Sequence, residues 1–142
     1  MELEGIINVS GKSGLFRVIS KASTTVIIES LIDKKRTVIY SNNQANLLEE
    51  IGIYAYNDTI PLNEIFTTIA KKTKCGPCIN HKSSKEDLTN YFREILPEYD
   101  EDRVYISDIK KVIQWYNIMQ SVDLIKIPKN KKKNKKEEKD EI

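Results

Sequence analysis

The sequence predicts an α+β protein, with a small SH3- or Tudor-like antiparallel barrel followed by a three-helix module and a disordered lysine-rich tail. Short β-branched runs separated by turn residues fill the first part of the chain. After Asp58 the apolar residues change from a period of 2 to a period of 3.6. From Lys126 onward almost no apolar residue occurs. We therefore expect a barrel at 1–58, a helical domain at 59–125 and the tail at 126–142.

Five short strands account for the predicted barrel. Turn-forming residues separate the first four, which we expect at 6–9, 15–19, 25–31 and 36–40. A short helical piece at 43–50 then leads to a closing strand at 51–56. Strands of this length and spacing are typical of a strongly bent SH3 or Tudor barrel. An OB-like barrel is the alternative, although it usually has longer strands.

Start and stop signals delimit three amphipathic helices. Pro61 suits a first helical position, Ser84 with Asp87 forms a capping box, Pro97 ends the second helix and Ser107 caps the third. The apolar faces consist of Leu62, Ile65, Phe66, Ile69 and Ala70, then Leu88, Tyr91, Phe92, Ile95 and Leu96, then Ile109, Val112, Ile113 and Tyr116. Trp115 adjoins the third face, which predicts a tryptophan in the core.

The stretch Cys75-Gly76-Pro77-Cys78 has the four letters of a thioredoxin active site. In that fold the motif follows a buried strand and opens a helix, whose N-terminus lowers the pKa of the first thiol. Here an amphipathic helix ends just before it, at Lys72, and a polar linker follows. We therefore expect a Gly-Pro turn in a polar surface loop, away from the apolar faces, and keep thiol redox chemistry as an alternative.

The same two cysteines and His81 read as C-x2-C-x2-H, which supplies three plausible zinc ligands. A structural zinc site normally has four, and the chain contains no further Cys or His. We therefore assign no metal and no other cofactor, and keep zinc at Cys75, Cys78 and His81 as an alternative.

Composition and charge limit the class of protein. No run approaches the roughly 20 apolar residues of a membrane helix, and the N-terminus lacks the basic region of a secretory signal. Two cysteines are too few for a secreted disulfide framework, so we expect a cytoplasmic protein without membrane contact. Eight lysines and four acidic residues give 126–142 a net charge of +4, and the total of +2 leaves −2 on residues 1–125.

Two features predict binding. Small barrels often bind peptides or nucleic acids through aromatic residues on one rim, and the candidates here are Phe16, Tyr40, Tyr54 and Tyr56. The tail offers contacts to RNA or other polyanions through Lys131, Lys132, Lys133, Lys135 and Lys136. Aromatic or arginine residues do not alternate with these lysines, so we expect no base-specific contact.

Several stretches resemble a family of small Bacteroidota proteins. They are "SGKSGLFRVISKA", "VIIESL", "PLNEIF" and above all "YFREILPEYDEDRVYISDIKKVIQWYN". The N-terminal part of that family is classed as a Tudor/SH3-like domain of unknown function, with a helical C-terminal companion. The resemblance covers roughly residues 5–120 and implies this architecture, but it implies no site residues.

These observations favour a non-catalytic cytoplasmic binding or adaptor protein, with a protein as the partner. The first alternative is an RNA- or ribosome-associated protein that uses the barrel and the basic tail. The second is a thiol redox or zinc-linked switch at Cys75 and Cys78. An exposed aromatic groove in acidic surroundings would favour the protein-binding adaptor, and a continuous basic face would favour the RNA-associated protein.

Overall fold

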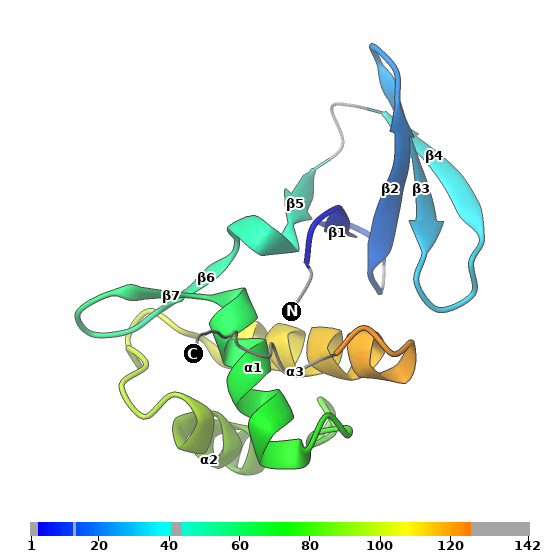
Figure 1. Cartoon of the computed structure of the whole chain (residues 1–142). Coiled ribbons are helices and arrows are strands. Elements are labelled where there is room, and N and C mark those ends of the chain that lie inside the picture. Colours follow the sequence, from blue (N-terminus) through cyan, green and yellow to red (C-terminus); the bar gives the residue numbers. More distant parts are fainter. Residues whose placement is uncertain (1–2, 13, 41–43, 126–142) are drawn as a thin grey trace, which may run out of the picture.

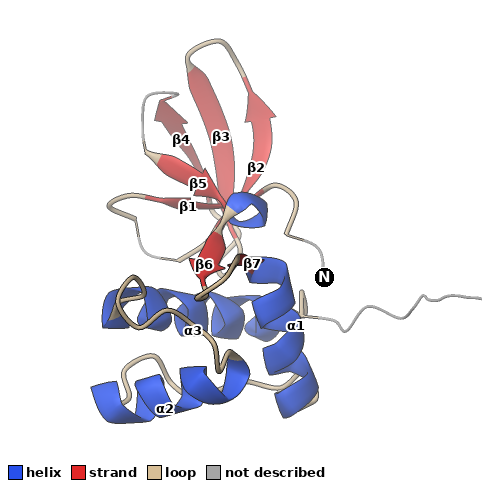
Figure 2. Cartoon of the chain, turned by 90° about the vertical axis from the view of Figure 1, so that its left-hand side faces the viewer, coloured by secondary structure: helices blue, strands red, loops and turns tan. Residues whose placement is uncertain are grey.

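The structure, a computed structural model, describes residues 3–12, 14–40 and 44–125. It is an α+β fold, in which an antiparallel sheet stands on three helices and a short hairpin lies between them (Figures 1 and 2). The predicted disordered tail at 126–142, with its lysines, lies outside the described residues. None of the helices in the described ranges is long and apolar enough to cross a membrane.

The main sheet has five antiparallel strands in the order β4-β3-β2-β1-β5. They are β1 (Ile6–Val9), β2 (Phe16–Lys21), β3 (Thr25–Ser30), β4 (Arg36–Tyr40) and β5 (Ala45–Leu47). The first four agree with the expected strands to within one or two residues. The register between β2 and β3 shifts between Val18 and Ser20, an irregularity of the kind that increases the local twist of a sheet.

The prediction of a closed barrel is wrong, because the sheet is open. The last strand, β5, comes from the segment expected to be helical, and of 43–50 only a 3-10 turn, η1 (Leu48–Glu50), is helical among the described residues. The segment expected to close the barrel forms β6 (Gly52–Tyr54) instead. It pairs with β7 (Thr59–Pro61) in a separate hairpin. Ile53 and Ala55 are buried, and Ile53 belongs to the same apolar cluster as the helices, which draws this segment away from the sheet.

The strand β1 has both faces buried, because each face belongs to a different core. Ile6 packs in the larger cluster with the helices. Ile7 and Val9 point to the opposite face of the sheet and pack there with Phe16, Ile28 and Ile39 in a second, small core. Successive side chains of a strand point to opposite faces, so four residues are enough to join the two cores.

The helices are α1 (Leu62–Thr73), α2 (Lys85–Ile95) and α3 (Ile106–Ser121). The predicted start of α2 is confirmed, since Ser84 Oγ accepts a hydrogen bond from the backbone N–H of Asp87 at 3.1 Å. The third helix begins earlier than predicted. Its N-cap is Tyr105, whose backbone N–H donates to Asp108 Oδ2 at 3.0 Å, and not Ser107.

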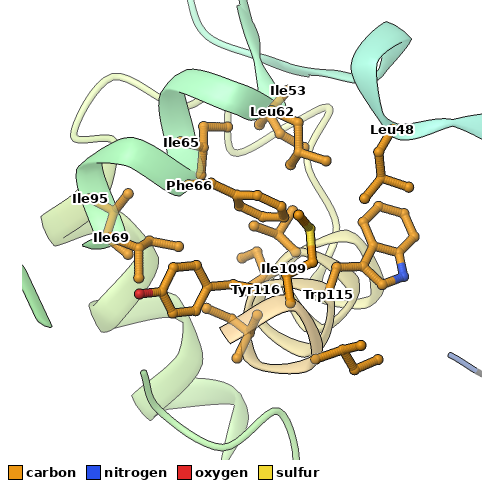
Figure 3. Close-up of a cluster of buried hydrophobic side chains, with 14 of the residues drawn as sticks. Leu48, Ile53, Leu62, Ile65, Phe66, Ile69, Ile95, Ile109, Trp115 and Tyr116 are labelled. Atoms are coloured by element: carbon orange, nitrogen blue, oxygen red, sulfur yellow. The ribbon is translucent and has the colours of Figure 1, made fainter. Parts of the chain in front are cut away.

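The larger core lies where α1 crosses α3 (Figure 3). Phe66 and Tyr116 meet edge to face there, with ring centroids 5.8 Å apart. Trp115 lies near Leu48 and is 7% exposed, which confirms that it belongs to the core.

We predict that Trp115→Ala lowers the free energy of unfolding by about 3–5 kcal/mol, because it leaves a cavity at the junction of sheet and helices. Urea denaturation followed by circular dichroism measures this change. Tyr105→Ala is the matched control, since that ring is 65% exposed, and it should shift stability by less than about 0.5 kcal/mol. Equal effects of the two substitutions would contradict the assignment of Trp115 to the core.

Candidate functional site

The Cys-Gly-Pro-Cys segment begins where α1 ends. Lys74 caps the helix in the left-handed conformation, and Cys75 also has a positive φ, of 65°. The backbone N–H of Cys75 donates to the carbonyl of Ala70 at 2.8 Å, which holds the turn against the helix end. The motif therefore follows a helix C-terminus, and the N-terminal dipole that activates a thioredoxin thiol is absent from it.

Two adjacent residues of α3 then hold the loop in place. Asn117 Oδ1 accepts from the backbone N–H of Cys78 at 2.8 Å, and its Nδ2 donates to the carbonyl of Ile79 at 3.0 Å. The Tyr116 hydroxyl donates to the carbonyl of Gly76 at 2.8 Å. The prediction of a polar loop away from the apolar faces is wrong, because Cys75, Cys78 and Ile79 pack against the larger core.

The position of Cys78 determines its chemistry. Burial raises the pKa of the Cys78 thiol to about 12, with hydrogen bonding as a smaller, opposing effect. His81 lines a separate cleft of about 410 Å³, together with Asp33 and Gln114. Within the described ranges, no three His, Cys, Asp or Glu side chains are grouped so as to hold a metal ion. The loop joins α1 to α2 and packs against the larger core.

The four candidate aromatic residues occupy different environments. Phe16 is 8% exposed and packs in the small sheet core, so it offers little surface to a partner. Tyr40 is 64% exposed and borders an apolar cavity of about 340 Å³ in the sheet, which Ile39 and Leu47 also line. Tyr54 and Tyr56 are 47% and 56% exposed and lie two residues apart, at β6 and just after it.

Alternation along an extended segment accounts for the exposure of Tyr54 and Tyr56. Ile53 and Ala55 point into the protein, at 7% and 2% exposure, so the two tyrosines point outward. The loop before α3 pairs with this segment. Asp100 N–H donates to Tyr54 O at 2.9 Å, Tyr56 N–H donates to Glu98 O at 3.0 Å, and Ala55 forms a bridge with Tyr99.

The buried ring of Tyr99 attaches the loop before α3 to the helices. It is 3% exposed and lies edge to face against Phe92, with ring centroids 5.1 Å apart. We call the two outward tyrosines, with the turn at 55–58 and the loop at 98–103, the tyrosine surface. Its backbone is held by hydrogen bonds on both sides, so the rings stand on a rigid support.

The charges around the tyrosine surface are mostly acidic. The Arg103 guanidinium lies 4.5 Å from the centroid of the Tyr54 ring, and its Nε donates to Asp100 Oδ2 at 2.8 Å. This hydrogen bond lowers the pKa of the Asp100 carboxyl. Five carboxylates belong to this part of the chain, at Asp58, Glu98, Asp100, Glu101 and Asp102, against two cations, at Arg93 and Arg103.

Sequence reasoning named Tyr54 and Tyr56 but missed Arg103 and Asn117. The contact of Arg103 with the carbonyl of Ala55 spans 48 positions of the chain, and that of Asn117 with Cys78 spans 39, and no local pattern indicates such pairs. The acidic run at 98–102 was the available signal for the surroundings of the tyrosines.

Comparisons with known proteins find matches to two families and to a solved structure. Residues 3–48 match the family described as a domain of unknown function, DUF5606, and residues 51–119 match another, DUF6852. A structural-genomics solution NMR structure of a protein from Bacteroides vulgatus resembles the chain with a TM-score of 0.74 and 36% sequence identity. The similarity covers 89% of this chain and 91% of that one. A search of curated proteins finds no match.

We predict that the Cys78 thiol reacts slowly in the native protein. In a Cys75→Ser variant, alkylation by iodoacetamide at pH 8 should be on the order of 100 to 1,000 times slower in buffer than in urea, because the thiolate is rare at a pKa of about 12. Mass spectrometry of timed samples measures both rates. Equal rates in buffer and urea would show that the loop leaves Cys78 open to solvent.

Proposed function

This chain belongs to the same protein family as the Bacteroides vulgatus protein, and we propose that it acts as a non-catalytic cytoplasmic binding or adaptor protein. The observation that carries the proposal is the tyrosine surface, where two exposed rings stand on a backbone held on both sides. Tyrosine provides a large contact area at a low entropic cost, because it has few rotatable bonds. A rigid support lowers the cost of binding further.

The chemistry of the surroundings indicates the kind of protein partner. Acidic groups outnumber basic ones around the tyrosines, and Arg93 and Arg103 are already paired with Glu101 and Asp100. A segment rich in Lys or Arg fits such a surface, since its cations meet both carboxylates and tyrosine ring faces. Nucleic acid fits it poorly, because phosphate groups would meet these carboxylates.

The Cys-Gly-Pro-Cys loop adds support for a non-catalytic role. A catalytic Cys-Gly-Pro-Cys motif opens a helix, whose N-terminus lowers the pKa of the first thiol, whereas here the motif follows the C-terminus of α1. Association with RNA or ribosomes remains the alternative function, carried by the five tail lysines named from the sequence. Residues 1–125 carry a net charge of −2, so any such binding should depend on residues 126–142.

We predict that the double variant Tyr54→Ala, Tyr56→Ala binds its protein partner at least about 10 times more weakly, because large central aromatics dominate interface energies. Affinity purification from the native cell after nuclease treatment identifies the partner, and titration calorimetry with the purified partner measures the change. Tyr105→Ala is the matched control, as Tyr105 is also exposed, at 65%, but lies outside the tyrosine surface. Undiminished binding by the double variant would contradict the proposal.

We predict that removal of residues 126–142 distinguishes binding of a protein from binding of RNA. If a protein is the partner, the truncated chain should bind it with at most about a twofold change, since recognition resides in the folded part. Fluorescence anisotropy with labelled single-stranded RNA, at two salt concentrations, tests the alternative. Strong RNA binding by residues 1–125 alone would favour the RNA-associated function over the adaptor function.

A further inference from the structure

A cleft of about 250 Å³ lies at the junction of the sheet and the helices, where β1, β5 and β6 meet α3. One stripe of α3 forms its wall. Asp108, Lys111, Val112 and Trp115 follow the spacing i, i+3, i+4, i+7, which places them on one helix face. The cleft is open to solvent and separate from the cysteine loop.

The deeper part of the cleft is apolar. Ile53, Val104, Val112 and Trp115 line it, and each is less than 10% exposed because its remaining surface is packed in the larger core. These side chains provide a site for an aliphatic or aromatic group, because burying such a group there removes apolar area from water. Trp115 is also the only tryptophan in the chain.

The rim of the cleft carries polar groups of several kinds. Asn8 and Asn46 are direct register partners on β1 and β5, and both line the cleft. Lys111 lines it as well and forms no ion pair with any residue that the structure describes. Asp108 also lines the cleft, and its Oδ2 accepts a hydrogen bond from the Tyr105 N–H at 3.0 Å.

Arg103 and Tyr54 close one side of the cleft as a stacked pair, 4.5 Å apart. The charge of Arg103 is matched by Asp100. The charged groups left for a ligand are therefore one cation, Lys111, and one anion, Asp108. Residues three apart on a helix have Cβ atoms about 5–6 Å apart, so the two side chains leave the helix at neighbouring positions. They form no ion pair with each other in the part of the chain that the structure describes.

We propose that this cleft binds a free α-amino acid with a medium-sized apolar side chain, such as leucine. The ligand carboxylate meets Lys111, its ammonium meets Asp108, and its side chain lies on the apolar wall beside Trp115. Asn8 and Asn46 supply further donors and acceptors for the two charged groups. The volume suits one such molecule, as it lies below the roughly 300–1,000 Å³ typical of larger ligands. This site is additional to the proposed partner binding and does not rest on it.

Trp115 fluorescence reports directly on the cleft, so the full-length protein can be titrated with L-leucine at pH 7. We expect a saturable change in emission within a ligand concentration of about 10 mM. N-acetyl-leucine lacks the ammonium charge, leucinamide lacks the carboxylate, and glycine lacks the side chain. Each should bind at least about 10 times more weakly than leucine, because each removes one matched group.

Variants test the two charged contacts. Lys111→Gln and Asp108→Asn should each weaken leucine binding at least about 10-fold, and the asparagine still accepts from the Tyr105 N–H, so α3 keeps its start. Lys110→Gln is the matched control, because Lys110 is exposed and does not line the cleft. Circular dichroism verifies that the variants are folded.

Three results would overturn the proposal. One is the lack of any saturable response to leucine in the folded wild-type protein. Another is equal binding by the Lys111 and Lys110 variants. The third is tighter binding of N-acetyl-leucine than of leucine, which would assign the cleft to the carboxyl terminus of a peptide.

Discussion

The strand β1 connects the sheet with the helices, because its side chains belong to two cores at once. Ile6 packs with the helices, whereas Ile7 and Val9 pack inside the sheet. Its backbone pairs with β2 on one side and β5 on the other, so its position is held by hydrogen bonds as well as by burial. The sheet is therefore fixed on the helices, and Asn8 is placed at the mouth of the junction cleft.

The helix α3 is the second organising element, and its successive residues serve three different parts of the molecule. Trp115 faces the junction cleft, Tyr116 fills the core against Phe66, and Asn117 holds the cysteine loop through two hydrogen bonds. Buried backbone groups need partners, and one amide side chain here satisfies both an N–H and a carbonyl. A loop that looks independent in the sequence is for this reason part of the folded core.

The sequence predicted the helices better than the sheet, for a physical reason. A helix is specified by local spacing and caps, so Ser84 located the start of α2, and Pro61, predicted as the first residue of α1, is its N-cap, one residue earlier. Strand pairing depends on distant partners. The apolar segment at 51–56 has the composition of a strand that closes a barrel. In the structure Ile53 and Ala55 are buried, and Ile53 packs with the helices, so the segment does not join the main sheet. Among the candidate binding residues, periodicity could not separate buried Phe16 from exposed Tyr54, since both are aromatic residues on strands.

The two proposed binding sites share two side chains, those of Tyr54 and Arg103, and this has a consequence for how they act. Tyr54 belongs to the tyrosine surface and also closes one side of the junction cleft, where Arg103 lies over its ring. Arg103 in turn contacts Asp100 and the carbonyl of Ala55, so the ring, the loop and the hairpin form one connected unit. A ligand that displaces the stacked pair changes the surface that a partner meets. If a ligand in the cleft changes the affinity for a partner by some factor, linkage requires that the partner change the affinity of the cleft for this ligand by the same factor.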